Sequence, residues 1–461
     1  MMRSYSFLKM FRKHVSSSVM LIAATVLALI VANSSLSEAY TRFWNLPMSL
    51  SIGKFNLLSH GGSTLTVMQF INDFLMMVFF FSVGLEIKRE ILVGELSSIK
   101  KAMLPVIGAM GGMIVPVLVF WLVCPDNPEM LRGSAIPMAT DIAFSLGVLS
   151  TFGRRVPLSL KVFLAALAVA DDLGGILVIA IFYSSDLQVN FLLYALGLVL
   201  ILIWGNIKGV RSKFFYIFVG IFVWYCILNS GIHATIAGVI VAFCIPATLK
   251  RTPTFFIEKI RKRINNFPVT PVKKGCKAPI LTQDQIGILK SIENASDHII
   301  SPLQDMEDSL HTPVNYFVIP IFAYANAGIV FEGMSLANLF SGVGLAVFLG
   351  LIIGKFVGVF SFSWLAVKFK LVGMPAGSNW KSFASVCALS GIGFTVAMFI
   401  ADLSYDSLVP ETALLLNDAK IGILCGSLLS GIISWLLLNK NLPRGCADTA
   451  NRTDRETRTD S

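Results

Sequence analysis

The sequence VFLAALAVADDLGGILVIAIFYSS, residues 162–185, decides the class of this protein. Its length is that of a membrane-spanning helix, which needs about 20 apolar residues to cross the hydrocarbon core. Its charged residues are Asp171 and Asp172, which stand side by side in the middle. A carboxylate at the centre of a membrane helix costs at least about 2.5–3.5 kcal/mol, so two of them indicate a function. Membrane carboxylates commonly handle cations or protons in a hydrated cavity, and the pair therefore points to ion transport.

The composition places most of the chain in a membrane. Of the 461 residues, 55% are hydrophobic and only 14% are charged, and the mean hydropathy is +0.75. These values exclude a mainly soluble chain and predict a polytopic membrane protein. The net charge of +10 does not indicate nucleic-acid binding, because the basic residues lie in short loops between apolar runs.

The cysteines and the N-terminus indicate neither a disulfide framework nor a cleaved leader. The seven cysteines have no paired spacing, and several lie inside apolar runs, which is typical of reduced packing residues. The basic start of the chain leads into an apolar run, 15–36, that is as long as a full span and has no convincing small-residue cleavage site. We expect this run to remain as the first span.

Twelve charge-poor runs are long enough to predict transmembrane helices. The stretch 214–249 is too long for one crossing, so it is divided at Asn229-Ser230-Gly231 into two short helices. The predicted spans are 15–36, 66–87, 102–124, 133–153, 162–185, 187–207, 214–228, 230–249, 312–331, 343–366, 382–401 and 410–438.

Basic residues alternate from loop to loop, which predicts the orientation of the chain. One side receives the basic N-terminus and then Lys88, Arg89, Lys100, Lys101, Arg154, Arg155, Lys161, Lys208, Arg211, Lys213, Lys368, Lys370, Lys381, Lys440 and Arg444. The other side receives only Arg42, Lys54 and Arg132. By the positive-inside rule the first side is cytoplasmic, so both termini are expected in the cytoplasm.

The spans form two groups around a long polar connection. Residues 1–14 are a cytoplasmic N-terminus, 15–249 carry spans 1–8, and 312–438 carry spans 9–12. The connection 250–311 is polar and contains several prolines, and we expect an amphipathic or partly disordered cytoplasmic segment. A regulatory role and a passive lipid-facing role are both open for it. The low-complexity tail 439–461 is expected to be disordered and cytoplasmic.

Other ionisable residues lie within the predicted spans. Four lie nearer the ends of their runs, where snorkelling or local pairing is enough: Asp73, Glu86, Asp418 and Lys420. A lone histidine such as His233, at the start of a short helix, is more often a hydrogen-bonded packing residue than a titrating sensor. Asp141 and Lys355 are harder to explain in this way. Lys355 is close to the middle of its run, where pairing with a carboxylate is the least costly way, in free energy, to neutralise its charge.

Two distant spans are interrupted in a related manner. Asp141 lies in AIPMATDIAF, residues 135–144, and a run of related form is SGIGFTVAMF, residues 390–399. Each is interrupted by glycine or proline next to a threonine. Paired interruptions in the two halves of a transporter predict broken helices whose ends meet at a midplane binding site. Asp141 and Lys355 would offset the exposed backbone dipoles with one charge of each sign.

Five motifs resemble those of bacterial NhaA-type sodium/proton antiporters and occur in the same order. They are ATDIAF (139–144), ADDLG (170–174), GIHATIAG (231–238), FAYANAG (322–328) and Gly354-Lys355. The resemblance covers nearly all of residues 15–438. It implies an all-α bundle of about twelve transmembrane helices in the inner membrane, with spans 3–5 and 10–12 as an inverted-topology repeat. Spans 4 and 11 would cross as broken helices.

The resemblance also implies a function and a set of residues. The protein would be a secondary transporter rather than an enzyme, without a cofactor. It would extrude Na⁺ or Li⁺ electrogenically in exchange for protons and be activated at alkaline pH, for sodium and pH homeostasis. Asp171 and Asp172 would bind the ion, Thr140 and Asp141 would contribute at the crossing, and Lys355 would pair with Asp171. The pH-response positions would be Glu86, Glu90, His233 and Glu307.

The resemblance has one further implication and one departure. A β-hairpin within 46–60 on the external face would join two protomers as a homodimer. The connection before Glu307 carries about fifty residues more than the short loop expected for such a family. This departure bears on the pH response more than on the transport chemistry.

Antiport needs only competition for one site. Burial and a neighbouring carboxylate both disfavour the charged form of an aspartate, so the pair holds protons near neutral pH until a hard cation displaces them. Displacement of two protons by one Na⁺ would move net charge, and the second proton could come from Asp171 or from Lys355.

Three other functions also use membrane carboxylates. A sodium-coupled symporter of an organic anion would keep the broken helices without needing paired aspartates. A passive cation channel would conduct without proton countermovement. An intramembrane aspartyl protease needs aspartates on facing helices, and sequence neighbours point about 100° apart, although Asp141 with Asp172 could form such a pair.

Overall fold

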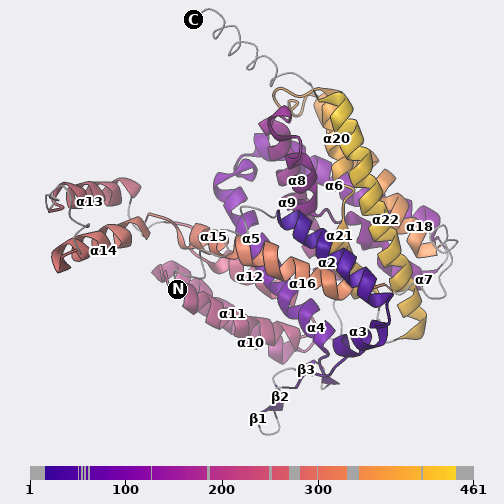
Figure 1. Ribbon diagram of the computed structural model, residues 1–461, viewed down its shortest axis with the longest axis horizontal. Helices are drawn as coiled ribbons and strands as arrows, with labels where there is room; N and C mark the ends of the chain where they lie inside the picture. The colour runs from indigo at the N-terminus through magenta and orange to yellow at the C-terminus, as the bar shows by residue number, and fades with distance from the viewer. Residues whose placement is uncertain are drawn as a thin grey trace, which may run out of the picture.

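The structure is a computed structural model that describes residues 16–49, 51–52, 55–56, 59–60, 63–125, 127–183, 187–248, 252–268, 281–297, 299–329, 342–405 and 409–442. The predicted N-terminal segment 1–14 and all but the first residues of the predicted tail 439–461 lie outside this range. Within it the chain is almost entirely helical (Figure 1). The all-α membrane fold expected from the sequence is confirmed.

Helices of the first half of the chain run as follows: α2 (Ser17–Ala32), α3 (Ser37–Trp44), α4 (Val67–Phe70), the π-helical η1 (Ile71–Leu75), α5 (Met76–Val93), η2 (Glu95–Ser97), α6 (Ile99–Val123), α7 (Pro128–Leu131), η3 (Arg132–Met138), α8 (Ile142–Ser150), η4 (Gly153–Arg155), α9 (Leu158–Phe182) and α10 (Val189–Lys208).

The remaining helices follow in chain order: α11 (Lys213–Leu228), α12 (Thr235–Cys244), α13 (Pro253–Asn265), α14 (Gln283–Asp297), α15 (Pro302–Pro313), the π-helical η5 (Val314–Val318), α16 (Ile319–Asn326), α18 (Gly342–Leu349), the π-helical η6 (Gly350–Gly354), α19 (Lys355–Lys368), α20 (Trp380–Leu389), α21 (Phe394–Ser404) and α22 (Pro410–Asn441).

Six continuous helices in the described part of the chain are long and apolar enough to span a membrane, and bent pairs raise this number to nine. The two predicted interruptions are confirmed: α7 and η3 meet α8 at 41°, and α20 meets α21 at 44°. A third pair, α2 and α3, is bent by 114°. The shorter apolar helices α11 and α12 follow the predicted division of 214–249. The total of twelve spans stays a prediction.

Short strands occupy the segment where a hairpin is expected. β1 (Ser51–Ile52) pairs antiparallel with β2 (Phe55–Asn56), and β3 (Ser59–His60) pairs antiparallel with β4 (Ser63–Thr64). The single hairpin expected within 46–60 is therefore two successive ladders, of which the second extends to Thr64. The residues at the turns of both ladders lie outside the described range.

The connection 250–311 contains helices. α13 and α14 pack against each other, and Figure 1 shows this pair standing away from the other helices. α15 begins at the end of the connection and continues through η5 into α16. The described part of the connection is therefore largely helical, whereas its residues 250–251, 269–280 and 298 lie outside the described range.

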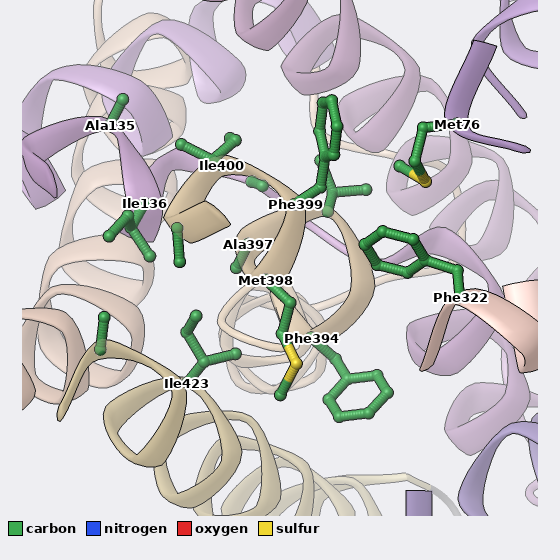
Figure 2. Packing of buried hydrophobic residues seen from close by; sticks show 14 of the residues in the cluster. Met76, Ala135, Ile136, Phe322, Phe394, Ala397, Met398, Phe399, Ile400 and Ile423 are labelled. Carbon is green, nitrogen blue, oxygen red and sulfur yellow. The ribbon is translucent and has the colours of Figure 1, made fainter. Parts of the chain in front are cut away.

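α21 is enclosed by the bundle. Phe394, Ala397, Met398, Phe399 and Ile400 are buried on it, and Figure 2 shows them among side chains from other helices. Those labelled neighbours are Met76, Ala135, Ile136, Phe322 and Ile423. Residues 394–401 are all buried, so this half-span is a core element rather than a lipid-facing one.

Glycines allow α6 and α19 to touch along their backbones. A Cβ atom on Gly111 would lie 2.3 Å from the carbonyl oxygen of Gly358, and one on Gly358 would lie 2.2 Å from that of Gly111. Gly354 faces the backbone of Pro116 in the same manner. This spacing of small residues is typical of close helix contacts in membranes. It fixes the helix that carries Lys355 against α6.

Candidate ion-binding site

Asp171 and Asp172 lie in the middle of α9, and both are buried. Asp171 Oδ2 forms an ion pair with Lys355 Nζ at 2.6 Å, and both side chains are 0% exposed. Lys355 follows directly after the π-helical turn η6, a kind of distortion that is frequent at functional sites. Neither charge can reach water, so each is neutralised by the other.

Gly112 of α6 makes room for this ion pair. A Cβ atom at Gly112 would lie 2.8 Å from Val359 Cγ2, 3.5 Å from Lys355 Nζ and 3.6 Å from Asp171 Oδ1. A side chain there would have to displace Val359, which packs beside the pair. The same oxygen, Asp171 Oδ1, is buried and finds no hydrogen-bond partner among the residues that the structure describes.

Thr140 joins Asp171 to the second interrupted span. Its Oγ1 lies 2.7 Å from Asp171 Oδ2 and 2.9 Å from the backbone oxygen of Ser390. A hydroxyl group carries one hydrogen and can donate to only one of these oxygens at a time. When Asp171 is ionised the hydroxyl can donate to it, and when Asp171 is protonated the hydroxyl can accept and donate to Ser390 instead.

Asp141 ties the two breaks together. Its Oδ1 accepts from Phe144 N at 3.0 Å and caps α8, while its Oδ2 accepts from Thr395 Oγ1 at 2.7 Å. Its own N–H donates to the backbone oxygen of Ile392 at 2.7 Å. A carboxylate thus lies at the N-terminal ends of two half-helices, where it offsets their dipoles. The two broken helices meet as the related sequence patterns predict.

Asp172 faces a cavity of about 500 Å³. Asp141, Thr140 and Thr395 also line this cavity, whereas Asp171 and Lys355 are not part of its lining. Asp172 Oδ1 is buried and has no hydrogen-bond partner among the described residues. The oxygens available to a hard cation at the inner end of the cavity are therefore those of Asp172, Asp141 and the two threonines. Among the described residues, no group of three or more His, Cys, Asp or Glu side chains forms a resident metal site.

Charged residues also line the cavity farther from Asp172. They include Glu86 and Arg89 of α5 and Glu307 of α15. Arg89 Nε lies 3.3 Å from Glu307 Oε1, and Arg89 Nη2 lies 2.9 Å from Glu90 Oε1. The other oxygen of Glu90 accepts from Glu95 N at 3.0 Å. Three of the predicted pH-response positions thus gather at this end of the cavity.

Glu307 lies on α15, before the predicted ninth span. Burial of its carboxyl group raises the pKa of Glu307 to about 7, Arg89 lowers it, and the nearby Glu86, Asp308 and Glu90 raise it further. The charge of this residue therefore changes near neutral pH.

His233 lies apart from this cluster. Its Nε2 is 4.0 Å from Asp73 Oδ1, its Nδ1 is 3.1 Å from Thr235 Oγ1, and its ring packs on Phe399. It is not among the residues that line the cavity. The fourth predicted pH-response position is therefore in a different part of the bundle from the other three.

Sequence reasoning missed three residues that the structure places in polar clusters. Thr395 binds Asp141, and Arg89 lines the cavity beside Glu307. Asp402 pairs with Lys420, with Nζ 2.9 Å from Oδ1. The related interruption around 390–399 was a signal for Thr395. Asp402 had a weaker signal, because it stands at the end of an apolar run.

Comparison with known proteins identifies the family. The model of the family Na⁺/H⁺ antiporter 1 matches residues 8–438. The chain belongs to this family. It is 52% identical to the Na⁺/H⁺ antiporter NhaA of Bacteroides fragilis over 431 residues, which are 94% of this chain and 97% of that protein. It is 50% identical over 446 residues to the Na⁺/H⁺ antiporter NhaA of Phocaeicola vulgatus, covering 96% and 97% of the two chains.

A more distant member agrees with these two. The Na⁺/H⁺ antiporter NhaA 2 of Syntrophotalea carbinolica is 43% identical over 434 residues, covering 93% of this chain and 95% of that protein. The sodium/proton antiporter family consists of transporters and not of enzymes. The resemblance found in the sequence is thereby confirmed, and the symporter alternative has no support among these relatives.

Proposed function

We propose that this Na⁺/H⁺ antiporter family member is a secondary active transporter that extrudes Na⁺ or Li⁺ in exchange for protons. The exchange is electrogenic, is activated at alkaline pH and serves sodium and pH homeostasis. The relatives' activity and the cavity that ends at Asp172 support this proposal. The transported ions are its substrates, and no cofactor takes part.

Asp172 carries the proposal. It is buried, it lies at the cavity, and within the described part of the chain its Oδ1 has no hydrogen-bond partner. A buried carboxylate in this setting either holds a proton or takes a cation, because an unpaired charge away from water is costly. Na⁺ and protons therefore compete for the same oxygens, and this competition couples their movements without a further device.

The Asp171–Lys355 pair supplies the second proton site in this proposal. Its two members share one ion pair, so they titrate as a unit. In this proposal Asp171 turns from Lys355 toward Na⁺ bound at Asp172, which weakens the attraction of Asp171 for Lys355, and the lysine then releases a proton. Two protons for one Na⁺ make the cycle electrogenic, so the membrane potential can drive Na⁺ outward.

Thr140 and Asp141 hold the crossing open for the ion. Thr140 contacts Asp171, while Asp141 bonds both half-helices at their breaks. These groups offset the exposed helix ends and place their oxygens toward the cavity, as broken helices in transporters require. A rocking of the half-helices changes the side from which Asp172 is reached.

The pH response belongs to the charged end of the cavity in this proposal. Glu86, Glu90 and Glu307 lie around Arg89 there, and ionisation of Glu307 near neutral pH changes its attraction to that arginine. His233 is retained as a pH-response candidate through its proximity to Asp73. It would act from outside the cavity.

The proposed setting is the bacterial inner membrane, with both termini and the cavity mouth on the cytoplasmic side. The basic loops support this orientation, because Arg89, which follows Lys88 in one of these loops, lines the cavity beside Glu307. A homodimer is proposed to form through the external segment 46–60. The short ladders between Ser51 and Thr64 provide a sheet edge for that contact.

Fluorescence dequenching in everted vesicles with an acid interior tests the proposed exchange. Addition of Na⁺ or Li⁺ should release protons, increasingly so toward alkaline pH, and K⁺ serves as the ion for comparison. Asp172→Asn should abolish the response. Asp418→Asn is the matched control, because Asp418 is a carboxylate in α22 away from the cavity lining. Normal exchange by an inserted Asp172→Asn variant would contradict the proposed site.

A further inference from the structure

A second ion pair joins four elements of the bundle away from the cavity. Lys420 Nζ of α22 lies 2.9 Å from Asp402 Oδ1 of α21, and the two side chains are 9% and 12% exposed. Asn72 Nδ2 of η1 donates to Asp402 Oδ2 at 3.3 Å. Asn326 Nδ2 of α16 donates to Asn72 Oδ1 at 2.8 Å. We refer to Asn72, Asn326, Asp402 and Lys420 as the outer network.

The outer network and the charged end of the cavity lie at opposite ends of the same helices. Asn72 and Glu86 share the continuous helix Val67–Val93, and fourteen residues along a helix correspond to about 21 Å. Glu307 and Asn326 lie on α15 and α16 within the run Pro302–Asn326, and the nineteen residues from one to the other correspond to about 28 Å. The outer network is therefore on the side of the bundle away from the cavity mouth.

α21 connects this network to the ion site. Thr395 near its start bonds Asp141, and Asp402 lies seven residues farther along, on the same face of the helix. Phe399 lies between them and packs on Phe80 and Phe322, with ring centroids 5.7 and 6.3 Å away. Figure 2 shows Phe399 and Phe322 in this packed layer. A short rigid helix thus has one end at the ion site and the other in the outer network.

Neutral hydrogen bonds also hold the outer end of α21. Tyr405 Oη donates to the backbone oxygen of Met130 at 2.7 Å, and Ser404 Oγ lies 3.0 Å from Tyr183 Oη. The ion pair differs from these bonds, because it is buried and charged. Separation of its members requires each charge to find water or a new partner. It can therefore bias the position of α21 more than a neutral bond can.

We propose that Asp402 and Lys420 are positioning residues for ion exchange. Their ion pair holds the outer end of α21 while the cavity is open at Glu86 and Glu307, and it separates when the ion site opens toward the opposite side. This inference rests on the proposed exchange. The outer network then sets the balance between the two arrangements, because it stabilises only one of them.

Neutralisation of Lys420 should change the half-saturating Na⁺ concentrations at the two faces of the protein in opposite directions. Loss of the pair destabilises the arrangement that is open at the cavity mouth, so fewer molecules accept Na⁺ there and more accept it from the other side. Lys420→Met should raise the half-saturating Na⁺ concentration at the cavity face by about fivefold or more. It should lower the half-saturating concentration at the opposite face.

The experiment compares everted and right-side-out vesicles, which present the two faces in turn to added Na⁺. Asp402→Asn is the second variant and should give the same opposite shifts. The double variant with Asp402→Lys and Lys420→Asp should restore both concentrations toward those of the original protein. Tyr405→Phe is the matched control at the same end of α21, because it removes a neutral hydrogen bond.

Equal shifts at both faces, or no shift with either single variant, would overturn the positioning role. Asp172→Asn is measured in the same vesicles, so the proposed exchange is tested separately. Exchange by the original protein that Asp172→Asn abolishes supports the proposed function whatever the outer variants do. An original protein that gives no exchange overturns the proposed function and this role with it.

Discussion

Two buried lysine–aspartate pairs differ in how completely their oxygens are used. The inner pair, Asp171 with Lys355, is 0% exposed, and no described residue forms a hydrogen bond with Asp171 Oδ1. In the outer pair, Asp402 uses one oxygen for Lys420 and the other for Asn72. A satisfied buried network makes a rigid joint, whereas an unsatisfied oxygen is held at a cost in free energy.

The inner pair is therefore suited to ion exchange, whereas the outer pair is suited to a structural role. The inner pair lies directly beside Asp172, whose Oδ1 is also unpartnered, so both aspartates can gain from a proton or a cation. In the outer pair both oxygens of Asp402 are already bonded, so it has less to gain from another ligand. We therefore expect ion exchange to depend on the identity of the inner groups, and to depend on the outer groups only through the arrangement they hold.

The largest effect is expected from breaking the inner pair. Lys355→Met leaves Asp171 buried without its counter-charge, which should lower the free energy of unfolding by about 3–5 kcal/mol and abolish electrogenic exchange. The measurements are thermal unfolding of the purified protein and proton release in vesicles. The double variant Lys355→Met with Asp171→Leu should regain stability without regaining exchange. Recovery of both by the double variant would make the inner pair structural.

The next largest effect is expected from a substitution at Gly112, which packs closely against the inner pair. Gly112→Ala places a Cβ atom 2.8 Å from Val359 and close to both members of the pair. Overpacking of this kind should lower the free energy of unfolding by about 1–3 kcal/mol and should reduce the rate of exchange. Gly175→Ala on α9 is the matched control, because a Cβ atom there meets nothing within 4 Å. Equal activity of the two variants would show that the close fit at Gly112 is unimportant.

The sequence is sufficient to predict the inner pair and not the outer one. A charge in the middle of a long apolar run can be recognised from the sequence alone, and this pattern identifies Asp171, Asp172 and Lys355. Asp402 stands at the end of its run, where a carboxylate needs no explanation. The sequence identifies Lys420 as an ionisable residue within its span, but the carboxylate nearest to it in the sequence is Asp418, two residues before it, and not Asp402. Residues two apart on a helix point about 200° apart, so these two face different sides.

Other parts of the fold show the same limit. The interruptions at Asp141 and near Thr395 are readable from their glycines, prolines and threonines, and the structure joins them by direct bonds. The hydrogen bond from Thr140 to Asp171 depends on how α9 packs against the crossing, which periodicity does not specify. The two ladders between Ser51 and Thr64, rather than one hairpin, depend on local turn conformation.

Thr140 offers a finer test of the inner pair. Thr140→Val removes the hydroxyl that lies between Asp171 Oδ2 and the backbone oxygen of Ser390. Loss of one hydrogen bond to a charged group corresponds to about 1.5–3 kcal/mol, so the half-saturating Na⁺ concentration should rise about tenfold or more. Thr140→Ser keeps the hydroxyl and should stay near the original value. The same rise in both variants would assign the effect to packing of the threonine methyl group.

The smallest effect is expected at the cavity mouth, outside both pairs. Because the pKa of Glu307 is raised to about 7, this carboxyl group is neutral below that pH and charged above it. Its attraction to Arg89, 3.3 Å away, therefore strengthens as the pH rises through about 7. Glu307→Gln fixes the neutral form and should shift the alkaline activation by about one pH unit or less, since the site is partly solvated.

The control for this prediction is Glu293→Gln on α14, which removes the same charge from an exposed side chain outside the cavity lining. The pH profile of proton release is measured for both variants at one Na⁺ concentration. A profile of Glu307→Gln that coincides with the original would remove Glu307 from the pH response. Because neither substitution touches a buried pair, the maximal rate at alkaline pH should stay nearly unchanged in both variants. Gating at the mouth and binding at the inner pair can thus be separated by experiment.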